Sequence, residues 1–100
     1  MLVGIGFDIH RHTKEEVLYF GGLKLDGAGF IAHSDGDILL HSICDALLGA
    51  VAKKDLGYYF PSNDTTPKKI ASTEMLKEVL QIINYNNYKV NNIDILVISQ

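Results

Sequence analysis

The chain has 100 residues, with 9 lysines and arginines against 12 aspartates and glutamates, which gives a formal net charge of −3. This length suffices for one small domain, and an acidic balance without a basic stripe argues against a nucleic-acid partner. The composition, 47% hydrophobic and 21% charged, is that of a globular protein, and no apolar run reaches the roughly 18 residues that a membrane span requires.

The cysteine content and the first residues give expectations about the compartment. A single cysteine, Cys44, rules out an internal disulfide and fits a reducing environment. The chain enters an apolar segment directly, without a signal-peptide or transit-peptide pattern. We therefore expect a cytoplasmic protein, and a processed organellar protein would show the same features.

The first elements in chain order are extended. In residues 2–10, apolar side chains alternate with glycines and polar residues, which predicts a β-strand. At this period of two, Asp8 and His10 leave the strand on the same face. Residues 17–20 and 23–25 flank a Gly-Gly pair and predict a short hairpin.

The strongest helix prediction covers residues 36–52. Ser34, Asp35 and Asp37 are suited to capping its N-terminus, and apolar residues recur along one face. Another face carries Asp37, His41 and Asp45 at a spacing of four, so these side chains stack along the helix.

The second half of the chain predicts a helix end at residues 55–57 with glycine as the C-cap, a loop over 58–67 and a helix over 72–84 with Ser72 as N-cap. Residues 93–99 predict a buried strand. Because domains seldom end on a central strand, we expect residues 1–100 to form a single incomplete domain. The expected fold is α/β (α+β layered), with a mixed sheet packed on helices.

Asp8, His10 and His41 together predict a metal site. One carboxylate and two imidazoles, with a fourth position open, are typical of catalytic zinc. Asp45, one turn beyond His41, is suited to orienting its imidazole. The alternative for each residue is structural: a capped aspartate and two histidines satisfied by the core.

Two further features have both a functional and a structural interpretation. Free backbone N–H groups after His33 and Ser34, at the predicted helix start, are suited to holding a phosphate, although serine and aspartate there are also ordinary caps. Cys44 is suited to ligating a soft metal, but a lone cysteine among Ile, Ala and Leu is more often a small buried hydrophobe.

Several motifs follow one another along the chain: GFDIHR (6–11), GG (21–22), AHSDGD (32–37), LH (40–41), DALLGA (45–50), DLG (55–57), FP (60–61) and Ser72. In this order and spacing the chain resembles the 2-C-methyl-D-erythritol 2,4-cyclodiphosphate synthase family of the non-mevalonate isoprenoid pathway, over about the first two-thirds of such an enzyme. The resemblance implies a lyase that closes a cyclic diphosphate from 4-diphosphocytidyl-2-C-methyl-D-erythritol 2-phosphate and releases CMP.

The resemblance also implies roles for individual residues. Asp8, His10 and His41 match the zinc ligands, and His33 matches the residue that stabilises the transition state. The residues implied to contact substrate are Asp8, His10, His33, Ser34, Asp55, Leu56, Gly57, Phe60, Pro61, Ser62, Asn63, Asp64, Ser99 and Gln100. The chain departs from the family's usual Phe-Pro-Asp-Thr-Asp at Ser62 and Asn63, which removes a carboxylate from this loop.

The remaining implications concern partners. The resemblance implies a cytidine diphosphate substrate, a homotrimer with shared active sites, and Mg²⁺ or Mn²⁺ on the diphosphate, whose glutamate ligand lies in a Thr-Thr-x-Glu segment absent from this chain. It implies no nucleic-acid or membrane partner, and a bacterial cytoplasmic or mature plastid location. Two alternatives stay open: a catalytically silent metal- or phosphate-binding fragment, and a metal phosphohydrolase that activates water.

Overall fold

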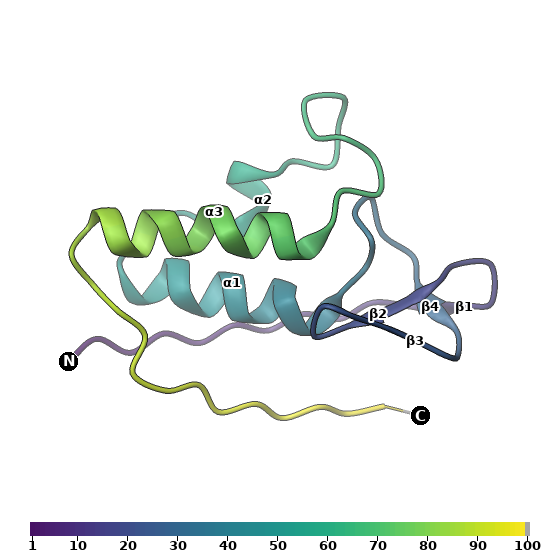
Figure 1. The fold of residues 1–100 in the computed structure, drawn as a ribbon, viewed down its shortest axis with the longest axis horizontal. Helices are drawn as coiled ribbons and strands as arrows, with labels where there is room; N and C mark the ends of the chain where they lie inside the picture. The colour runs from purple at the N-terminus through teal and green to yellow at the C-terminus, as the bar shows by residue number, and fades with distance from the viewer. Residues whose placement is uncertain (100) are drawn as a thin grey trace.

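The computed structural model describes residues 1–99, with helices at the centre and strands at one end (Figure 1). The elements are β1 His12–Thr13, β2 Leu18–Phe20, β3 Leu23–Leu25, β4 Gly29–Phe30, α1 Ile38–Ala50, α2 Leu56–Tyr59 and α3 Ser72–Tyr85. Helices α1 and α3 pack side by side and both begin at the end of the molecule that carries the strands. The expected combination of strands and packed helices is confirmed, but the two sheets found within residues 1–99 are two-stranded and antiparallel, so the expected mixed sheet is not seen in this part of the chain.

The hairpin prediction is confirmed by β2 and β3. The two strands pair antiparallel, with Phe20 opposite Leu23. Gly21 and Gly22 have φ angles of +65° and +83°. A two-residue turn of type I′ needs positive φ at both positions, which glycine adopts without a steric cost.

The two long helices lie where the sequence predicts them, but one cap differs. Asp37 is the N-cap of α1, and its side chain accepts from the N–H of Leu40. The N-cap of α3 is Ala71, without a side-chain hydrogen bond. The prediction of Ser72 as N-cap is therefore wrong: Ser72 is the first residue of the helix, and its side chain is fully buried among other polar groups.

The region between the long helices corrects a second prediction. Residues 55–57 begin a helix instead of ending one, since the Asp55 side chain caps α2 by accepting from the N–H of Tyr58. The loop predicted over 58–67 therefore starts after Tyr59. Leu56 of α2 joins the core with four residues of the long helices: Cys44, Leu48, Met75 and Val79.

The two end segments are extended but belong to no strand pair within residues 1–99, so the predicted strands over 2–10 and 93–99 are wrong for this part of the chain. Residues 93–99 are also exposed instead of buried, with Leu96 86% and Ile98 88% exposed. A strand requires a neighbouring strand to accept and donate its hydrogen bonds, and within residues 1–99 no strand is paired with either segment.

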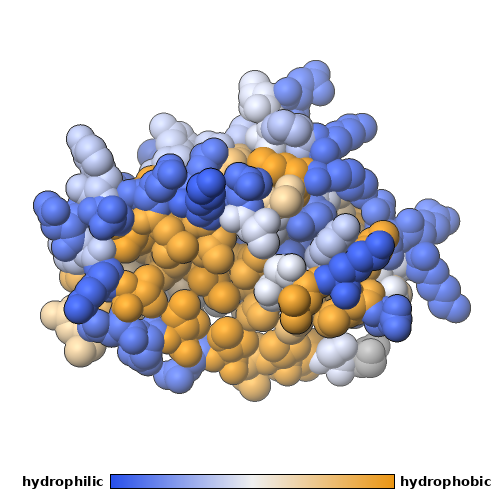
Figure 2. Space-filling model, viewed as in Figure 1, coloured by the Kyte–Doolittle hydropathy of each residue, from blue (hydrophilic) through white to orange (hydrophobic). Residues whose placement is uncertain are grey.

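The predicted alternation within residues 2–10 is nevertheless present. Ile5, Phe7 and Ile9 are mostly exposed, whereas Asp8 and His10 are half-buried. Figure 2 shows a broad apolar area where Figure 1 draws the helices and the end segments. No helix within residues 1–99 combines the length and hydropathy needed to cross a membrane.

Two glycines bring the first segment close to α1. A Cβ atom on Gly4 would lie 1.9 Å from the carbonyl oxygen of Ala46, and one on Gly6 would lie 1.8 Å from that of Ser42. Both neighbours are helix backbone, which cannot rotate away as a side chain can. The absence of a Cβ at these positions therefore sets how near Asp8 and His10 come to the helix.

We predict that Gly6→Ala destabilises the protein by about 1–3 kcal/mol or more, because the added methyl overlaps the backbone of α1. Gly49→Ala is the matched control, since a Cβ there meets nothing within 4 Å and a helical Gly→Ala change stabilises by roughly 0.5–1 kcal/mol. Urea unfolding of both variants measures the difference. Equal stability of Gly6→Ala and wild type would contradict the close approach.

Candidate metal centre

Three potential metal ligands converge where the first segment crosses the start of α1. The Oδ2 atom of Asp8 lies 3.1 Å from Nδ1 of His10 and 3.3 Å from Nδ1 of His41. One ligand atom from each residue lies within 4.8 Å of the others. The structure thus brings together the three residues that the sequence predicts, two from the extended segment and one from the helix.

The state of Asp8 suits a metal ligand. Burial by itself raises the pKa of Asp8, but the side chains of His10 and His41 together outweigh it and lower that pKa to about 2. Asp8 Oδ2 and His10 Nδ1 are both buried, and within residues 1–99 neither has a hydrogen-bond partner of suitable geometry, although the two atoms lie 3.1 Å from each other. Buried polar atoms normally have partners, so these two atoms fit a divalent cation between them.

The other nitrogen of His41 is held by hydroxyl groups. Its Nε2 atom lies 3.1 Å from Oγ of Ser34 and 2.9 Å from Oγ of Ser72. Asp45, predicted to orient His41, instead accepts from the N–H of Leu56 at 2.8 Å. Burial, together with the charges of Asp55 and Asp8, raises the pKa of Asp45. Asp45 therefore joins α1 to the start of α2, and the hydrogen bond predicted from it to His41 is wrong.

A cavity of about 270 Å³ opens at this cluster. Of the predicted site residues it is lined by Asp8, His10, His33, Ser34, His41, Asp45, Leu56, Gly57, Phe60 and Ser62. Asp55, Pro61, Asn63 and Asp64 do not line it. Ser99 lies in the exposed end segment, and Gln100 lies outside the described residues.

Four backbone N–H groups around the start of α1 are already used within the chain. The N–H groups of Gly36 and Asp37 donate to the side chains of Ser34 and Asp35, and that of Leu40 donates to Asp37. The N–H of Asp35 donates to the carbonyl of Ile70. The prediction that free N–H groups here hold a phosphate is therefore wrong for these four donors, because the chain's own side chains and backbone use them.

His33 faces the cavity from the loop before α1. Its Nε2 atom lies 2.7 Å from the carbonyl oxygen of Thr66. A carbonyl oxygen only accepts, so Nε2 of His33 carries a hydrogen and donates it. This bond attaches the loop before α3 to the residues that precede α1, and it leaves Nδ1 as the other polar atom of the ring.

The chain matches known proteins along its length. The family model described as YgbB matches residues 1–100. The chain belongs to the YgbB family. Among its curated relatives, the 2-C-methyl-D-erythritol 2,4-cyclodiphosphate synthase of Halothermothrix orenii is 40% identical over 101 residues, covering 100% of this chain and 61% of the relative. That of Buchnera aphidicola subsp. Schizaphis graminum is 46% identical, covering 100% and 60%.

Solved structures agree with the YgbB assignment. A structure of 2C-methyl-D-erythritol-2,4-cyclodiphosphate synthase superposes with a TM-score of 0.78 at 37% identity, covering 85% of this chain and 57% of that one. The CDP complex of IspF from Plasmodium falciparum gives 0.73 at 36% identity, covering 91% and 55%. The chain spans about three-fifths of the length of these curated YgbB relatives. The resemblance and the expected fold are confirmed.

The structure adds contacts that the sequence did not indicate. Thr66, Met75 and Ala32 line the cavity, and Ser72 contacts His41. Ser72 precedes an apolar helix, so the sequence favoured a capping role for it. Its contact joins positions 31 apart in the chain, and no local periodicity signals such a pairing.

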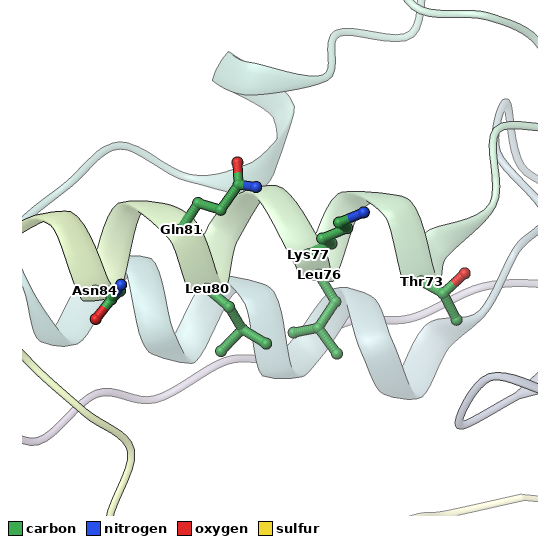
Figure 3. A pocket seen from close by; sticks show the side chains of 6 residues that line it. All are labelled: Thr73, Leu76, Lys77, Leu80, Gln81 and Asn84. Carbon is green, nitrogen blue, oxygen red and sulfur yellow. The ribbon is translucent and has the colours of Figure 1, made fainter.

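Another hollow, of about 380 Å³, lies along α3 and is separate from this cluster. Figure 3 shows Leu76 and Leu80 on one side of the helix and Gln81 on the other. Its lining offers a single charged group, Lys77, and no carboxylate, imidazole or thiol. The groups that could bind a metal therefore gather at the first cavity.

We predict that purified protein, at the full length its gene encodes, holds about one divalent metal ion per chain and that His41→Ala abolishes this loading. Removing the imidazole leaves Asp8 and His10 as two ligands. Elemental mass spectrometry gives the metal content. His12→Ala is the control, because His12 is exposed and lies outside the cavity. Unchanged metal content in His41→Ala would contradict the ligand set.

A second prediction concerns Cys44, which is fully buried within the core. Burial, with the charges of Asp45 and Asp37, raises the pKa of its thiol to about 12. At pH 8 only about one thiol in ten thousand would be ionised, and the thiolate is the reactive form. We expect Ellman's reagent to label Cys44 in guanidinium but not in the native protein; rapid labelling without denaturant would refute this.

Proposed function

We propose that the protein containing this chain converts 4-diphosphocytidyl-2-C-methyl-D-erythritol 2-phosphate to 2-C-methyl-D-erythritol 2,4-cyclodiphosphate. An oxygen of the 2-phosphate attacks the β-phosphorus, the bond from that phosphorus to the CMP oxygen breaks, and CMP leaves. Such phosphoryl transfer depends on positioning and charge neutralisation more than on a covalent nucleophile. The family membership and the names of its relatives support this reaction.

The observation that carries the proposal is the composition of one cavity. Asp8, His10 and His41 present a cluster of ligands on its wall, and His33 and Ser34 lie beside them. Phosphate oxygens would meet a cation and hydrogen-bond donors in the same place, which is what a transferring phosphoryl group requires.

The donor set of one carboxylate and two imidazoles favours zinc as the metal. Zinc bound there would polarise a phosphate oxygen and orient that phosphate for the transfer. Asp8 is already ionised at neutral pH, since its pKa of about 2 lies far below that pH. Its carboxylate therefore needs no proton loss when the metal binds.

Other residues would hold the substrate. His33 and Ser34 would contact a phosphate, with His33 stabilising the transition state. Asp55, Leu56 and Gly57 would bind the methylerythritol unit, of which Leu56 and Gly57 line the cavity. The loop residues proposed to cover the substrate are Phe60, Pro61, Ser62, Asn63 and Asp64. Ser99 and Gln100 would begin the cytidine-binding segment.

The proposal extends to partners of the whole protein. Mg²⁺ or Mn²⁺ would neutralise charge on the diphosphate, a role that suits a hard cation, and its protein ligand would lie outside this chain. A homotrimer would complete each active site from neighbouring subunits. The protein would act in the bacterial cytoplasm or, in its mature form, in a plastid.

The test is turnover by the protein at the length its gene encodes. We expect CMP and the cyclic diphosphate in equal amounts by chromatography and ³¹P NMR. His33→Ala should lower kcat by about 100-fold or more through loss of a transition-state donor. His12→Ala, whose side chain is exposed, serves as the control. Inorganic phosphate in place of the cyclic product would indicate a phosphohydrolase, and no turnover by zinc-loaded protein would indicate a silent binding protein.

A further inference from the structure

A hydrogen-bond chain runs from the partly buried carboxylate of Asp35 through Ser72 to His41. The Oγ of Ser72 donates to Oδ1 of Asp35, and the backbone N–H of Ser72 donates to Oδ2 at 3.0 Å. The same Oγ lies 2.9 Å from Nε2 of His41. Ser72 is fully buried and His41 is 9% exposed, so the contact between them is shielded from water, whereas Asp35 is only partly buried.

The direction of each bond follows from what these groups can donate. A carboxylate only accepts, so the single hydroxyl hydrogen of Ser72 is used on Asp35. The Ser72 oxygen can then only accept from His41, which requires a hydrogen on Nε2. In the neutral imidazole this leaves the lone pair on Nδ1, the atom that lies 3.3 Å from Asp8 Oδ2. These two atoms then face each other as acceptors, a contact that becomes favourable when a cation lies between them.

We propose that Asp35 and Ser72 are positioning residues that hold His41 in the tautomer with hydrogen on Nε2, so that Nδ1 faces the metal. The inference rests on the proposed metal centre. Ligating histidines commonly donate their second nitrogen to a carboxylate or carbonyl group. Here the carboxylate is one hydroxyl away, because Asp35 contacts Ser72 and Ser72 contacts His41. Neither residue touches the metal or the reacting atoms.

Asp35 is itself held in place by donors on both oxygens. Besides Ser72 it accepts from the backbone N–H of Asp37 at 3.1 Å. These bonds join the loop before α1 to the first residue of α3. The imidazole of His41 is therefore held relative to the starts of both α1 and α3. These contacts restrict its rotation and its tautomer.

The first measurement uses wild-type protein, at the length its gene encodes, without metal at pH 8. Long-range ¹H–¹⁵N NMR distinguishes the protonated from the unprotonated ring nitrogen, and His41→Ala assigns the signals of His41. We expect a hydrogen on Nε2 and a lone pair on Nδ1. A predominant tautomer with hydrogen on Nδ1 would overturn the inference without any variant of Ser72.

The second measurement is zinc affinity by chelator competition. Ser72→Ala should bind zinc about 10–100-fold more weakly, since the tautomer is no longer fixed. Ser72→Thr keeps the hydroxyl and should restore most of the affinity. Thr73→Ala removes a hydroxyl from the next, exposed position of α3 and should change nothing. Circular dichroism establishes that each variant is folded.

The outcomes separate this inference from the proposed function. Wild-type zinc affinity in folded Ser72→Ala would overturn the inference and leave the reaction intact. Weaker binding together with a mixture of His41 tautomers would support it. If wild-type protein binds no zinc, the proposed function fails, and the tautomer seen in the metal-free protein alone decides the inference.

Discussion

The carboxylate of Asp37 is the interaction on which the rest of this structure depends. It is fully buried and accepts from three backbone N–H groups: those of Gly21, Gly22 and Leu40. An unpaired buried carboxylate is strongly unfavourable, but three donors and the positive end of a helix compensate this one. Asp37 thereby joins the hairpin turn to α1, and His41 follows one helical turn later.

Local signals in the sequence were sufficient for the elements around Asp37. Gly21 and Gly22 predict the hairpin because only glycine readily adopts positive φ at both turn positions. A polar cap followed by an apolar stripe predicts α1. The metal cluster could also be predicted, since the period of two places Asp8 and His10 on one face and the helix supplies His41.

Long-range features were not accessible in the same way. The spacing of four along the helix correctly places His41 and Asp45 next to each other. It does not indicate that the N–H of Leu56, 11 residues later in the chain, donates to the carboxylate of Asp45. Ser72 reaches His41 across 31 positions, and its burial depends on how α3 packs on α1. The strand predictions for the two end segments are wrong for a related reason. A strand is defined by the partner strand to which it hydrogen-bonds, whereas alternation in the sequence specifies only which side chains share a face.

The positions of the hydrogens around His41 link the candidate metal centre to Ser34, which also lines the cavity. If Nε2 carries a hydrogen, Ser34 also accepts from it, and Ser34 already accepts from the N–H of Gly36. Both acceptor positions of that hydroxyl are then used, so its own hydrogen is left to donate. Ser34 is only 5% exposed and lines the cavity, where an anion would be the favoured acceptor. The carboxylate of Asp35 would thus direct a lone pair toward the candidate metal site and a hydrogen toward the cavity, where the substrate phosphate is proposed to bind.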